Sequence, residues 1–280
     1  MIGPEKLKEH EPHAAGIRAL WVPTTGIVDF AAVARKYAEL IERAGGKVLT
    51  SAGVTGIRRS GGNIVETQRG AFQARMLVNC AGLYADRIAR MAGSDPGLRI
   101  IPFRGEYYEL AESSRKLVRG LIYPVPDPAL PFLGVHFTRR VNGSVEAGPN
   151  AVLALRQEGY RKTDFSLTEL ATTFRFGGFW KMARRFWRTG AKEYYRSFSK
   201  SAFTHSLQKL LPELREQDLS PGGSGVRAQA IDPAGKLVDD FCFVQSDGMM
   251  HVLNVPSPAA TASLVIGREI TSLVELSQVQ

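Results

Sequence analysis

Two side chains, Arg227 and His136, have the chemistry needed to bind and deprotonate a small acidic molecule. Arg227 lies two residues after Gly225 on a predicted short strand, and a guanidinium can grip a carboxylate through two parallel hydrogen bonds. His136 lies within another predicted strand, and an imidazole can take up a proton near neutral pH. Each residue also has an ordinary structural interpretation: a salt bridge for the arginine and a hydrogen-bonded packing role for the histidine. Arg104, beside Gly105, is a second candidate cation with the same two interpretations.

Small residues mark three corners where the backbone could approach a flat ligand. The first is Cys80–Gly82, which follows the apolar run Met76–Val78 and precedes helical apolar spacing over Leu83–Met91. A strand, a tight turn and a helix in this order bring backbone amides close to an anion or a flat cofactor. The same pattern also forms ordinary corners of α/β proteins. The second corner is Gly225, and the third lies within Asn254–Thr261.

The third corner leads into the last predicted helix, Thr261–Leu273. Pro256 and Pro258 hold the approach extended, and Ala259 and Ala260 keep the helix start free of bulky side chains. A helix start carries partial positive charge from its aligned peptide dipoles, so it could stabilise a developing anion. The alternative is a proline-bounded loop that caps a surface helix.

The elements that must position these residues predict an α/β (α+β) chain with interleaved domains. Residues 1–99 and 221–280 mix strands with helices, whereas 100–220 is rich in apparently antiparallel strands and holds a helical insertion over 160–211. Asp29 is a predicted N-cap of a helix that ends at Gly45-Gly46.

Shorter segments carry weaker signals. Short strands are predicted over Trp21–Gly26 and Lys47–Leu49, and Ser220–Gly225 is predicted to be a loop. The first residues, 1–19, show no clear period and are predicted to be irregular.

The composition and net charge of the chain limit the kinds of function and ligand that we expect. With 280 residues, 44% hydrophobic and 22% charged, the chain can bury a substantial core, and it has no apolar run of membrane-spanning length and no apolar signal core at its start. Cys80 and Cys242 have no disulfide or metal spacing, and the histidines share no ligand pattern, so we expect a reducing, cytoplasmic setting and no metal site. The net charge of +9 favours an acidic small molecule or an anionic membrane surface, because no nucleic-acid-binding motif is present.

A basic, aromatic segment accounts for part of that charge. Six residues are predicted to share one helical face: Phe176, Phe179, Trp180, Ala183, Phe186 and Trp187. Lys181, Arg184, Arg185 and Arg188 lie largely on another face. Such a helix could lie in the interface of an anionic membrane, or it could pack on the neighbouring domain with its basic face solvated.

Several stretches together resemble the glycine oxidase/D-amino-acid oxidase superfamily of FAD enzymes. The segments that resemble the superfamily are V-N-C-A-G-L-Y-A-D from Val78, S-G-V-R-A from Ser224 and L-N-V-P-S-P-A-A-T from Leu253. P-T-T-G-I-V-D, P-F-R-G-E-Y-Y, L-G-V-H-F-T and G-V-R-A-Q-A are similar to one branch, the L-2-hydroxyglutarate oxidases (dehydrogenases), and they follow the family's order over nearly the whole chain.

The resemblance implies FAD as cofactor and oxidation of a 2-hydroxy acid, most simply L-2-hydroxyglutarate to 2-oxoglutarate, with electrons passing to oxygen or a membrane quinone. It implies catalytic roles for His136, Arg227 and Arg104, and a substrate pocket formed by Arg227, Thr138 and Tyr123. The implied cofactor contacts are Val54, Ala81, Gly82, Gly225, Ser257, Ala259, Ala260 and Thr261. The implied domains are a flavin-binding domain made of the chain ends and an inserted substrate domain.

One expected motif is missing from the sequence. A dinucleotide enzyme of this kind opens with a strand, G-x-G-x-x-G and a helix. The approximate match Gly223–Ala228 follows a polar stretch and precedes a strand, so it is not a phosphate loop. The resemblance implies that the N-terminal flavin-binding unit lies outside this chain. The alternatives are therefore a related oxidase of amines or glycerol 3-phosphate, and a non-catalytic fragment that acts as a basic peripheral membrane or scaffold protein.

Overall fold

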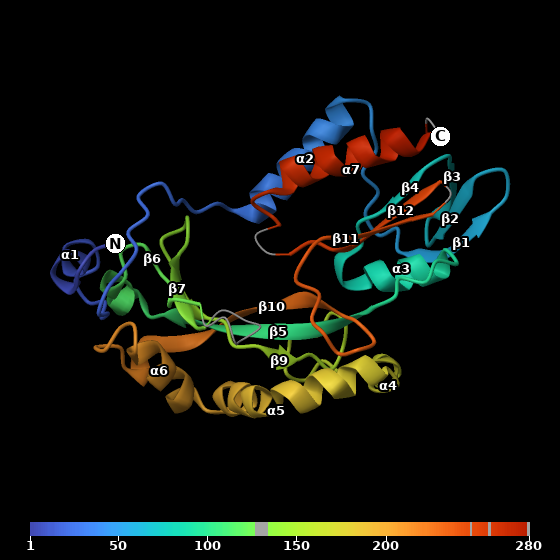
Figure 1. The fold of residues 1–280 in the computed structure, drawn as a ribbon. Helices are drawn as coiled ribbons and strands as arrows, with labels where there is room; N and C mark the ends of the chain where they lie inside the picture. Colours follow the sequence, from blue (N-terminus) through green and yellow to red (C-terminus); the bar gives the residue numbers. More distant parts are fainter. Residues whose placement is uncertain (127–133, 247, 257–258, 279–280) are drawn as a thin grey trace.

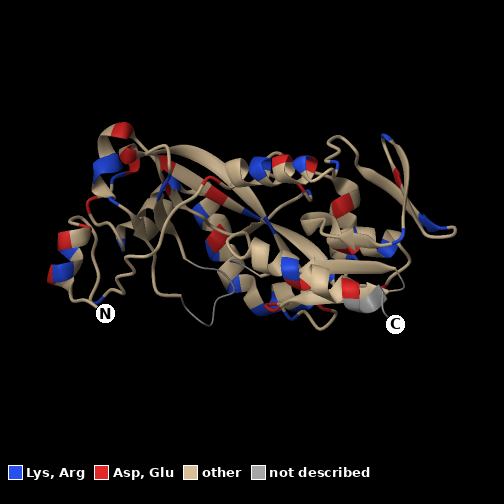
Figure 2. Ribbon diagram, turned by 90° about the horizontal axis from the view of Figure 1, so that it is seen from above, with Lys and Arg blue, Asp and Glu red and all other residues tan. Residues whose placement is uncertain are grey.

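The computed structural model describes residues 1–126, 134–246, 248–256 and 259–278. The molecule is elongated, and its N- and C-termini lie toward opposite ends in both ribbon views (Figure 1 and Figure 2). Helices lie on both sides of a long central sheet, and a mixed sheet lies nearer the C-terminus (Figure 1). The predicted α/β (α+β) class is confirmed.

The central sheet is antiparallel, as predicted. Its strand order is β10 (Leu219–Ile231), β5 (Arg99–Leu110), β8 (Val145–Gly148), β7 (His136–Arg139) and β6 (Leu121–Ile122), and β9 (Val152–Leu153) also pairs with β5. β10 and β5 pair from Leu219 opposite Leu110 to Ile231 opposite Arg99. Residues 221–231 therefore belong to this sheet, and the chain leaves it only after β10, later than the domain division at 220 predicted.

Three helices cover one face of the central sheet: α4 (Leu167–Phe174), α5 (Gly177–Phe198) and α6 (Lys200–Gln208), the lower face in Figure 1. Phe203 of α6 is buried in one core cluster with Phe137 of β7. Met182 of α5 is buried in another with Ile101 and Ile231. Buried apolar side chains of the strands thus anchor α5 and α6 on the sheet.

The mixed sheet is formed by β11 (Cys242–Ser246), β12 (Met249–Asn254) and β4 (Leu77–Asn79), with β12 and β4 parallel. After β4 the chain turns through the 3-10 helix η1 (Gly82–Tyr84) into α3 (Ala85–Met91), whose Ala85 and Ala89 are buried against Leu253. A further antiparallel sheet contains β1 (Val54–Arg59), β2 (Asn63–Thr67) and β3 (Gly70–Ala74).

Helices α2 (Phe30–Arg43) and α7 (Ser263–Gln278) lie on the other side of the central sheet from α5 (Figure 1). The predicted start of α2 is confirmed, since the Asp29 side chain accepts hydrogen bonds from the amides of Ala31 and Ala32 at 2.9 and 3.2 Å. Within the part of the chain that the structure describes, no helix combines the length and apolarity needed to cross a membrane.

The short N-terminal helix α1 (Pro4–His10) lies in a segment predicted to be irregular. The following residue, Glu11, accepts hydrogen bonds from the amides of Arg119 and Gly120 at 2.9 and 2.6 Å. These contacts join the start of the chain to the middle segment, near two short 3-10 helices, η2 (Glu112–Leu117) and η3 (Glu216–Asp218).

Three local predictions are wrong. Trp21–Gly26 and Lys47–Leu49 are not strands, because a strand needs a neighbour for its backbone groups and these segments have none among the described residues. Ser220–Gly225 is part of β10 rather than a loop. β10 is an edge strand, which tolerates proline and glycine, and its register shifts between Pro221 and Ser224.

The packing of α6 on the sheet makes Phe203 a test of the core. Phe203 is 1% exposed, and we expect Phe203→Ala to lower the free energy of unfolding by about 3–5 kcal/mol. Phe72→Ala is the matched control, because Phe72 is 42% exposed and its loss should cost less than about 1 kcal/mol. Denaturant titration of both variants checks this, and equal losses would contradict the assigned core.

Candidate active site

Strand register places the predicted substrate residues on one face of the central sheet. Arg227 lies opposite Phe103 in the β10–β5 pair. His136 lies opposite Gly148, and Thr138 lies opposite Glu146, in the β7–β8 pair. Because side chains alternate and cross-strand partners point the same way, these residues share one face. We call this face the active face.

His136 is held on the active face by three contacts. Its ring stacks on Tyr123 with centroids 4.1 Å apart, and the Tyr123 hydroxyl lies 3.4 Å from the Thr138 hydroxyl. His136 Nδ1 lies 3.1 Å from the Gly134 carbonyl oxygen. Since a carbonyl only accepts, Nδ1 carries a proton and donates it, which leaves the lone pair on Nε2. Burial lowers the pKa of His136, and the Gly134 hydrogen bond only partly opposes this shift.

Tyr107 joins the active face although it was not among the predicted site residues. It lies two alternations from Phe103 along β5 and therefore points the same way as Arg227. Burial raises the pKa of Tyr107, with a further contribution from Glu146, whereas the nearby Arg227 charge lowers it. Arg227 remains exposed at the surface of β10, although crowding by neighbouring atoms lowers its pKa. The alternation in P-F-R-G-E-Y-Y was visible in sequence, but the partner strand that makes it informative was not.

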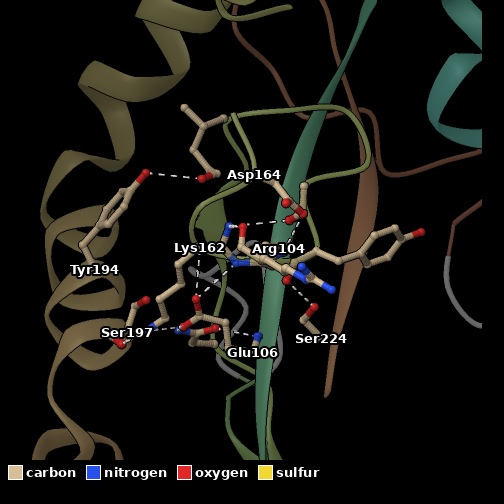
Figure 3. Close-up of polar contacts among 12 residues, drawn as sticks. Arg104, Glu106, Lys162, Asp164, Tyr194, Ser197 and Ser224 are labelled. Atoms are coloured by element: carbon tan, nitrogen blue, oxygen red, sulfur yellow. Dashed lines mark hydrogen bonds and ion pairs between the residues drawn. The ribbon is translucent and has the colours of Figure 1, made fainter. Parts of the chain in front are cut away.

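Arg104 lies on the opposite face, away from Arg227 and His136. It is 5% exposed and pairs with Glu106 at 3.0 Å, and Figure 3 shows this pair between β5 and α5. Its Nη1 also donates to the Arg161 carbonyl oxygen at 3.1 Å. The structure thus does not bring Arg104 to the other predicted catalytic residues, because positions 104 and 103 of one strand point to opposite faces.

The Arg104–Glu106 pair is the centre of a satisfied polar network. Asn150 donates to Glu106 Oε2 at 2.8 Å, and Lys162 lies 3.7 Å from the same carboxylate (Figure 3). Burial alone would raise the pKa of Glu106, but hydrogen bonds from Ser197, Asn150 and Arg104 outweigh it and hold that pKa below its usual value. The network ties the 150–162 segment to the back of β5.

Gly105, beside Arg104, does not open space for a ligand. A Cβ at this position would lie 2.8 Å from Pro149 Cβ, so the glycine is required by the packing of Pro149 on β5.

The first predicted cofactor corner is built by Asn79 at the end of β4. Its side-chain amide donates to the Ala85 carbonyl at 2.8 Å, and its oxygen accepts from the Ala81 amide at 3.1 Å. Gly82 has a φ of +53°, which favours glycine, and a Cβ there would meet no atom within 4 Å. Ala81 and Gly82 are exposed, so this turn presents open backbone to a ligand.

The other corners lie near the first. β12 ends at Asn254 beside the end of β4, because the two strands are parallel and His251 lies opposite Asn79. The 3-10 helix η1 contacts both β12 and β10, and β10 carries Gly225 with open space around its Cβ position. The convergence of the three small-residue corners on one ligand stays a prediction.

The remaining predicted cofactor contacts are less constrained. Ala259, Ala260 and Thr261 lead into α7, and Ser257 lies outside the described residues. Val54 opens β1, a strand that contacts α3. Their contacts with a cofactor stay predictions.

His251 of β12 supports the first corner from below the surface. It is completely buried, with Nδ1 3.1 Å from the Asn79 amide nitrogen and Nε2 3.3 Å from the Ser94 hydroxyl. Since the Asn79 oxygen already accepts from Ala81, the Asn79 nitrogen donates and His251 Nδ1 accepts. Burial lowers the pKa of His251, so a neutral imidazole supports the turn at Gly82.

Known proteins match this chain closely. Residues 1–273 match the family of FAD dependent oxidoreductases. The chain belongs to this family. An L-2-hydroxyglutarate dehydrogenase of Indibacter alkaliphilus is 51% identical over 94% of the chain and 66% of the relative. The Escherichia coli K12 protein of that name is 43% identical over 98% of the chain and 65% of the relative, and the human mitochondrial one is 42% identical over 98% and 63%. The chain thus spans less than two thirds of these relatives.

Solved structures share the fold of this chain. An L-alpha-glycerophosphate oxidase from Mycoplasma pneumoniae, with FAD bound, gives a TM-score of 0.70 at 18% identity and covers 98% of the chain and 64% of its own. A glycine oxidase from Geobacillus kaustophilus gives a TM-score of 0.61 at 17% identity over 98% and 62%.

The buried neutral histidines predict a pH-dependent stability. Because the folded-state pKa of His251 is lowered, the unfolded chain takes up a proton first, and the free energy of unfolding falls as pH drops below about 6.5. We expect the thermal midpoint to fall between about pH 7.5 and pH 5.5, and His251→Gln to reduce that slope. His136 contributes the remaining part.

His205→Gln is the matched control for this measurement, since His205 is an exposed histidine on α6. Differential scanning fluorimetry measures the thermal midpoint at each pH. The midpoint of His205→Gln should change with pH as much as that of the unmodified chain. If the midpoint of His251→Gln changed with pH as much as the midpoints of His205→Gln and the unmodified chain, His251 would not be the buried neutral histidine that we assign.

Proposed function

We propose that this oxidoreductase oxidises L-2-hydroxyglutarate to 2-oxoglutarate with FAD as its cofactor. The observation that carries the proposal is the 51% identity, over 94% of the chain, with an L-2-hydroxyglutarate dehydrogenase. The arrangement of the active face supports it, since Arg227, His136 and Thr138 share one side of the sheet. A 2-hydroxy dicarboxylate needs a cation for a carboxylate and a base for its hydroxyl proton, and this face offers both.

The described residues fit a flavin. A flat ring needs close approach to backbone, and the open positions at Gly82 and Gly225 allow it where η1 meets β10. We assign the ring contacts to Ala81, Gly82, Gly225 and the residues before α7, namely Ala259, Ala260 and Thr261, and the nucleotide contact to Val54. When bound, FAD supplies a two-electron acceptor for the hydrogen on substrate C2.

Arg227 binds a substrate carboxylate in this proposal. Its guanidinium can form two parallel charge-assisted hydrogen bonds, and the hydroxyls of Tyr107, Tyr123 and Thr138 lie on the same face to orient the substrate. Arg104 has no substrate role, because it is buried on the other side with Glu106.

His136 accepts the hydroxyl proton. Nδ1 donates to Gly134, so the lone pair on Nε2 is available, and stacking on Tyr123 holds the ring plane. The lowered pKa keeps the imidazole neutral near pH 7, as a general base requires. Loss of the C2 hydrogen with its electron pair and of this proton converts the C2 hydroxyl to a carbonyl.

The electrons leave to oxygen or to a membrane quinone in this proposal. The thiols of Cys80 and Cys242 are free, which fits a reducing compartment, so we propose a cytoplasmic protein, with peripheral contact to the inner face of the membrane if quinone is the acceptor.

Flavin absorbance tests the proposal directly. The purified chain is incubated with FAD, alone and together with a polypeptide that corresponds to the part of the Indibacter relative that the chain does not cover. We expect a flavin spectrum that bleaches on anaerobic addition of L-2-hydroxyglutarate, because its carboxylate and hydroxyl meet Arg227 and His136.

The controls separate the rival functions. The D enantiomer should bleach the flavin much more slowly, whereas faster bleaching by glycerol 3-phosphate or an amino acid would assign a different substrate. Absence of bound flavin in both arms would favour the non-catalytic fragment.

Substitutions of Arg227 and His136 should have different kinetic effects once flavin is bound. Arg227→Met removes a charge-assisted carboxylate contact, so we expect KM for L-2-hydroxyglutarate to rise about 10- to 100-fold. His136→Gln removes the base, so we expect the rate of flavin reduction to fall about 100- to 10,000-fold with a smaller change in KM. Stopped-flow reduction measures both.

Arg104→Met serves as the comparison variant on the opposite face. It should lower stability, because Glu106 loses its buried partner, while the flavin that remains bound still reduces. Equal effects of Arg227→Met and His136→Gln on both KM and reduction would contradict their separate roles.

A further inference from the structure

Residues 155–166, between β9 and α4, form a loop whose two ends are joined. The Ser166 amide donates to the Leu155 carbonyl oxygen at 3.0 Å, and the first helix after the loop begins only at Leu167. The helical insertion therefore starts later than residue 160, where the sequence predicts it. Compact loops with joined ends are packed by their own side chains and frequently carry function. We call this segment the 155–166 loop.

One side of the 155–166 loop holds the turn at Gly82. Gln157 is 4% exposed, and its side-chain nitrogen donates a hydrogen bond to the Leu83 carbonyl oxygen in η1. Its side-chain oxygen accepts a hydrogen bond from Arg87 Nη2 at 3.2 Å. A carbonyl only accepts and a guanidinium only donates, so the two partners fix the orientation of the Gln157 amide. Gln157 thus joins the turn to α3, the helix that follows it.

Glu169, in the first turn of α4, completes this arrangement. One of its carboxylate oxygens accepts from Arg87 Nη1 at 3.0 Å, and the other accepts from the Gln157 backbone amide at 2.7 Å. Gln157, Arg87 and Glu169 therefore form a closed set of hydrogen bonds, in which each residue restrains the other two. The Glu169 side chain is 20% exposed, so water screens this ion pair less than it screens a surface pair.

Asn79 holds the same turn from the mixed sheet. Its side chain accepts from the Ala81 amide at 3.1 Å and donates to the Ala85 carbonyl at 2.8 Å. Asn79 and Gln157 together satisfy three backbone groups around Gly82, while Gly82 itself stays exposed. A backbone that is held in advance in this way loses little conformational entropy when a ligand binds to it.

The 155–166 loop also contacts β10 beside Gly225. Ser224 Oγ donates to the Tyr160 carbonyl oxygen at 2.6 Å, and Arg104 Nη1 donates to the Arg161 carbonyl oxygen at 3.1 Å (Figure 3). Ser224 immediately precedes Gly225, which has open space at its Cβ position. One loop therefore contacts the turn at the first predicted cofactor corner and the strand that carries the second, although the two corners lie far apart in sequence.

The Leu83 carbonyl that Gln157 holds is coupled to the shape of the turn. This carbonyl and the Tyr84 amide belong to one planar peptide unit, which rotates as a whole. The Tyr84 amide closes the turn by donating to the Ala81 carbonyl oxygen at 3.0 Å. Without Gln157, the Leu83 carbonyl would rotate toward water to find another donor, and that rotation would weaken the hydrogen bond that closes the turn.

We propose that Gln157 is a positioning residue for the flavin, which it serves by holding the backbone at Gly82 in the orientation that the cofactor contacts. The proposal rests on the proposed function, because it takes FAD as the ligand of this turn. A binding site needs its contacting groups fixed within a fraction of an ångström by surrounding residues that are themselves held in place. Gln157 meets this requirement, since Arg87 and Glu169 restrain it in turn.

Hydrogen exchange tests the positioning role without flavin. Gln157→Met keeps a side chain of similar size but removes its hydrogen bonds to Leu83 and Arg87. We expect the backbone amides of residues 81–86 to exchange about 5- to 30-fold faster in this variant, because the turn loses a buried hydrogen bond. Mass spectrometry of peptides that cover residues 78–91 measures this rate.

Glu11→Met is the matched control. Glu11 is 7% exposed, and it also holds a backbone turn, through the amides of Arg119 and Gly120 in another part of the chain. Its loss should lower the thermal midpoint but leave the exchange of residues 81–86 as it is in the unmodified chain.

Flavin binding tests the consequence for the cofactor. The dissociation constant of FAD is measured by flavin fluorescence, with and without the polypeptide that supplies the uncovered part of the Indibacter relative. We expect Gln157→Met to raise this constant about 5- to 30-fold and to shift the absorbance maximum of the flavin that binds. Glu11→Met should change neither, because a general loss of stability does not alter the surroundings of a bound flavin.

Three results would overturn the proposal. Exchange of residues 81–86 could be unchanged in Gln157→Met, which would show that the turn does not depend on this side chain. The affinity and absorbance of FAD could be the same in Gln157→Met and the unmodified chain. FAD could bind in neither arm, which would remove the proposed cofactor as well. By contrast, a flavin that needs Gln157 but is not bleached by L-2-hydroxyglutarate would contradict the proposed substrate and support the positioning role.

Discussion

The pairing of β5 with β10 is the constraint on which the other features depend. The two strands run antiparallel from Leu219 opposite Leu110 to Ile231 opposite Arg99, with one register shift near Pro221. Because side chains alternate, a slip of one residue would exchange the two faces of the sheet along that whole length. Arg227 reaches the active face only because it lies opposite Phe103, while Arg104 one position later is carried beneath the sheet. The chemistry of the active face is thus set by register.

A buried polar network below the sheet joins β5 to the 150–162 segment. Arg104, Glu106 and Asn150 satisfy one another between β5 and α5, and Lys162 adds a nearby charge (Figure 3). A buried ion pair contributes little net stability compared with a well-packed apolar pair, but removing one partner strands a charge. These contacts hold the 150–162 segment against β5, and the loss of one partner would leave a buried polar group unsatisfied. β5 therefore points Tyr107 to the active face and Arg104 to the opposite face.

A second local device connects distant parts of the chain. Asn79 at the end of β4 contacts His251 on the parallel strand β12, and it also holds the turn at Ala81. Residues separated widely in sequence therefore share one buried hydrogen-bonded site, which explains why a neutral histidine belongs to the support of a small-residue corner. Helix α5 is positioned by core packing alone. Its inner side is buried against the sheet, and its outer side is exposed.

The sequence by itself determined features that depend on near neighbours along the chain. The Asp29 cap of α2 and the small-residue turn at Gly82 follow from local spacing and turn chemistry. The resemblance carried by short words of sequence identified the family. Tertiary structure decided which face each strand residue occupies, and so separated Arg104 from Arg227 and added Tyr107. It also decided that residues 220–225 belong to β10 and that Phe179, but not Trp180, is buried in the core. The reason is physical: an alternating strand or an aromatic helix is compatible with either orientation until a partner from elsewhere in the chain buries one side.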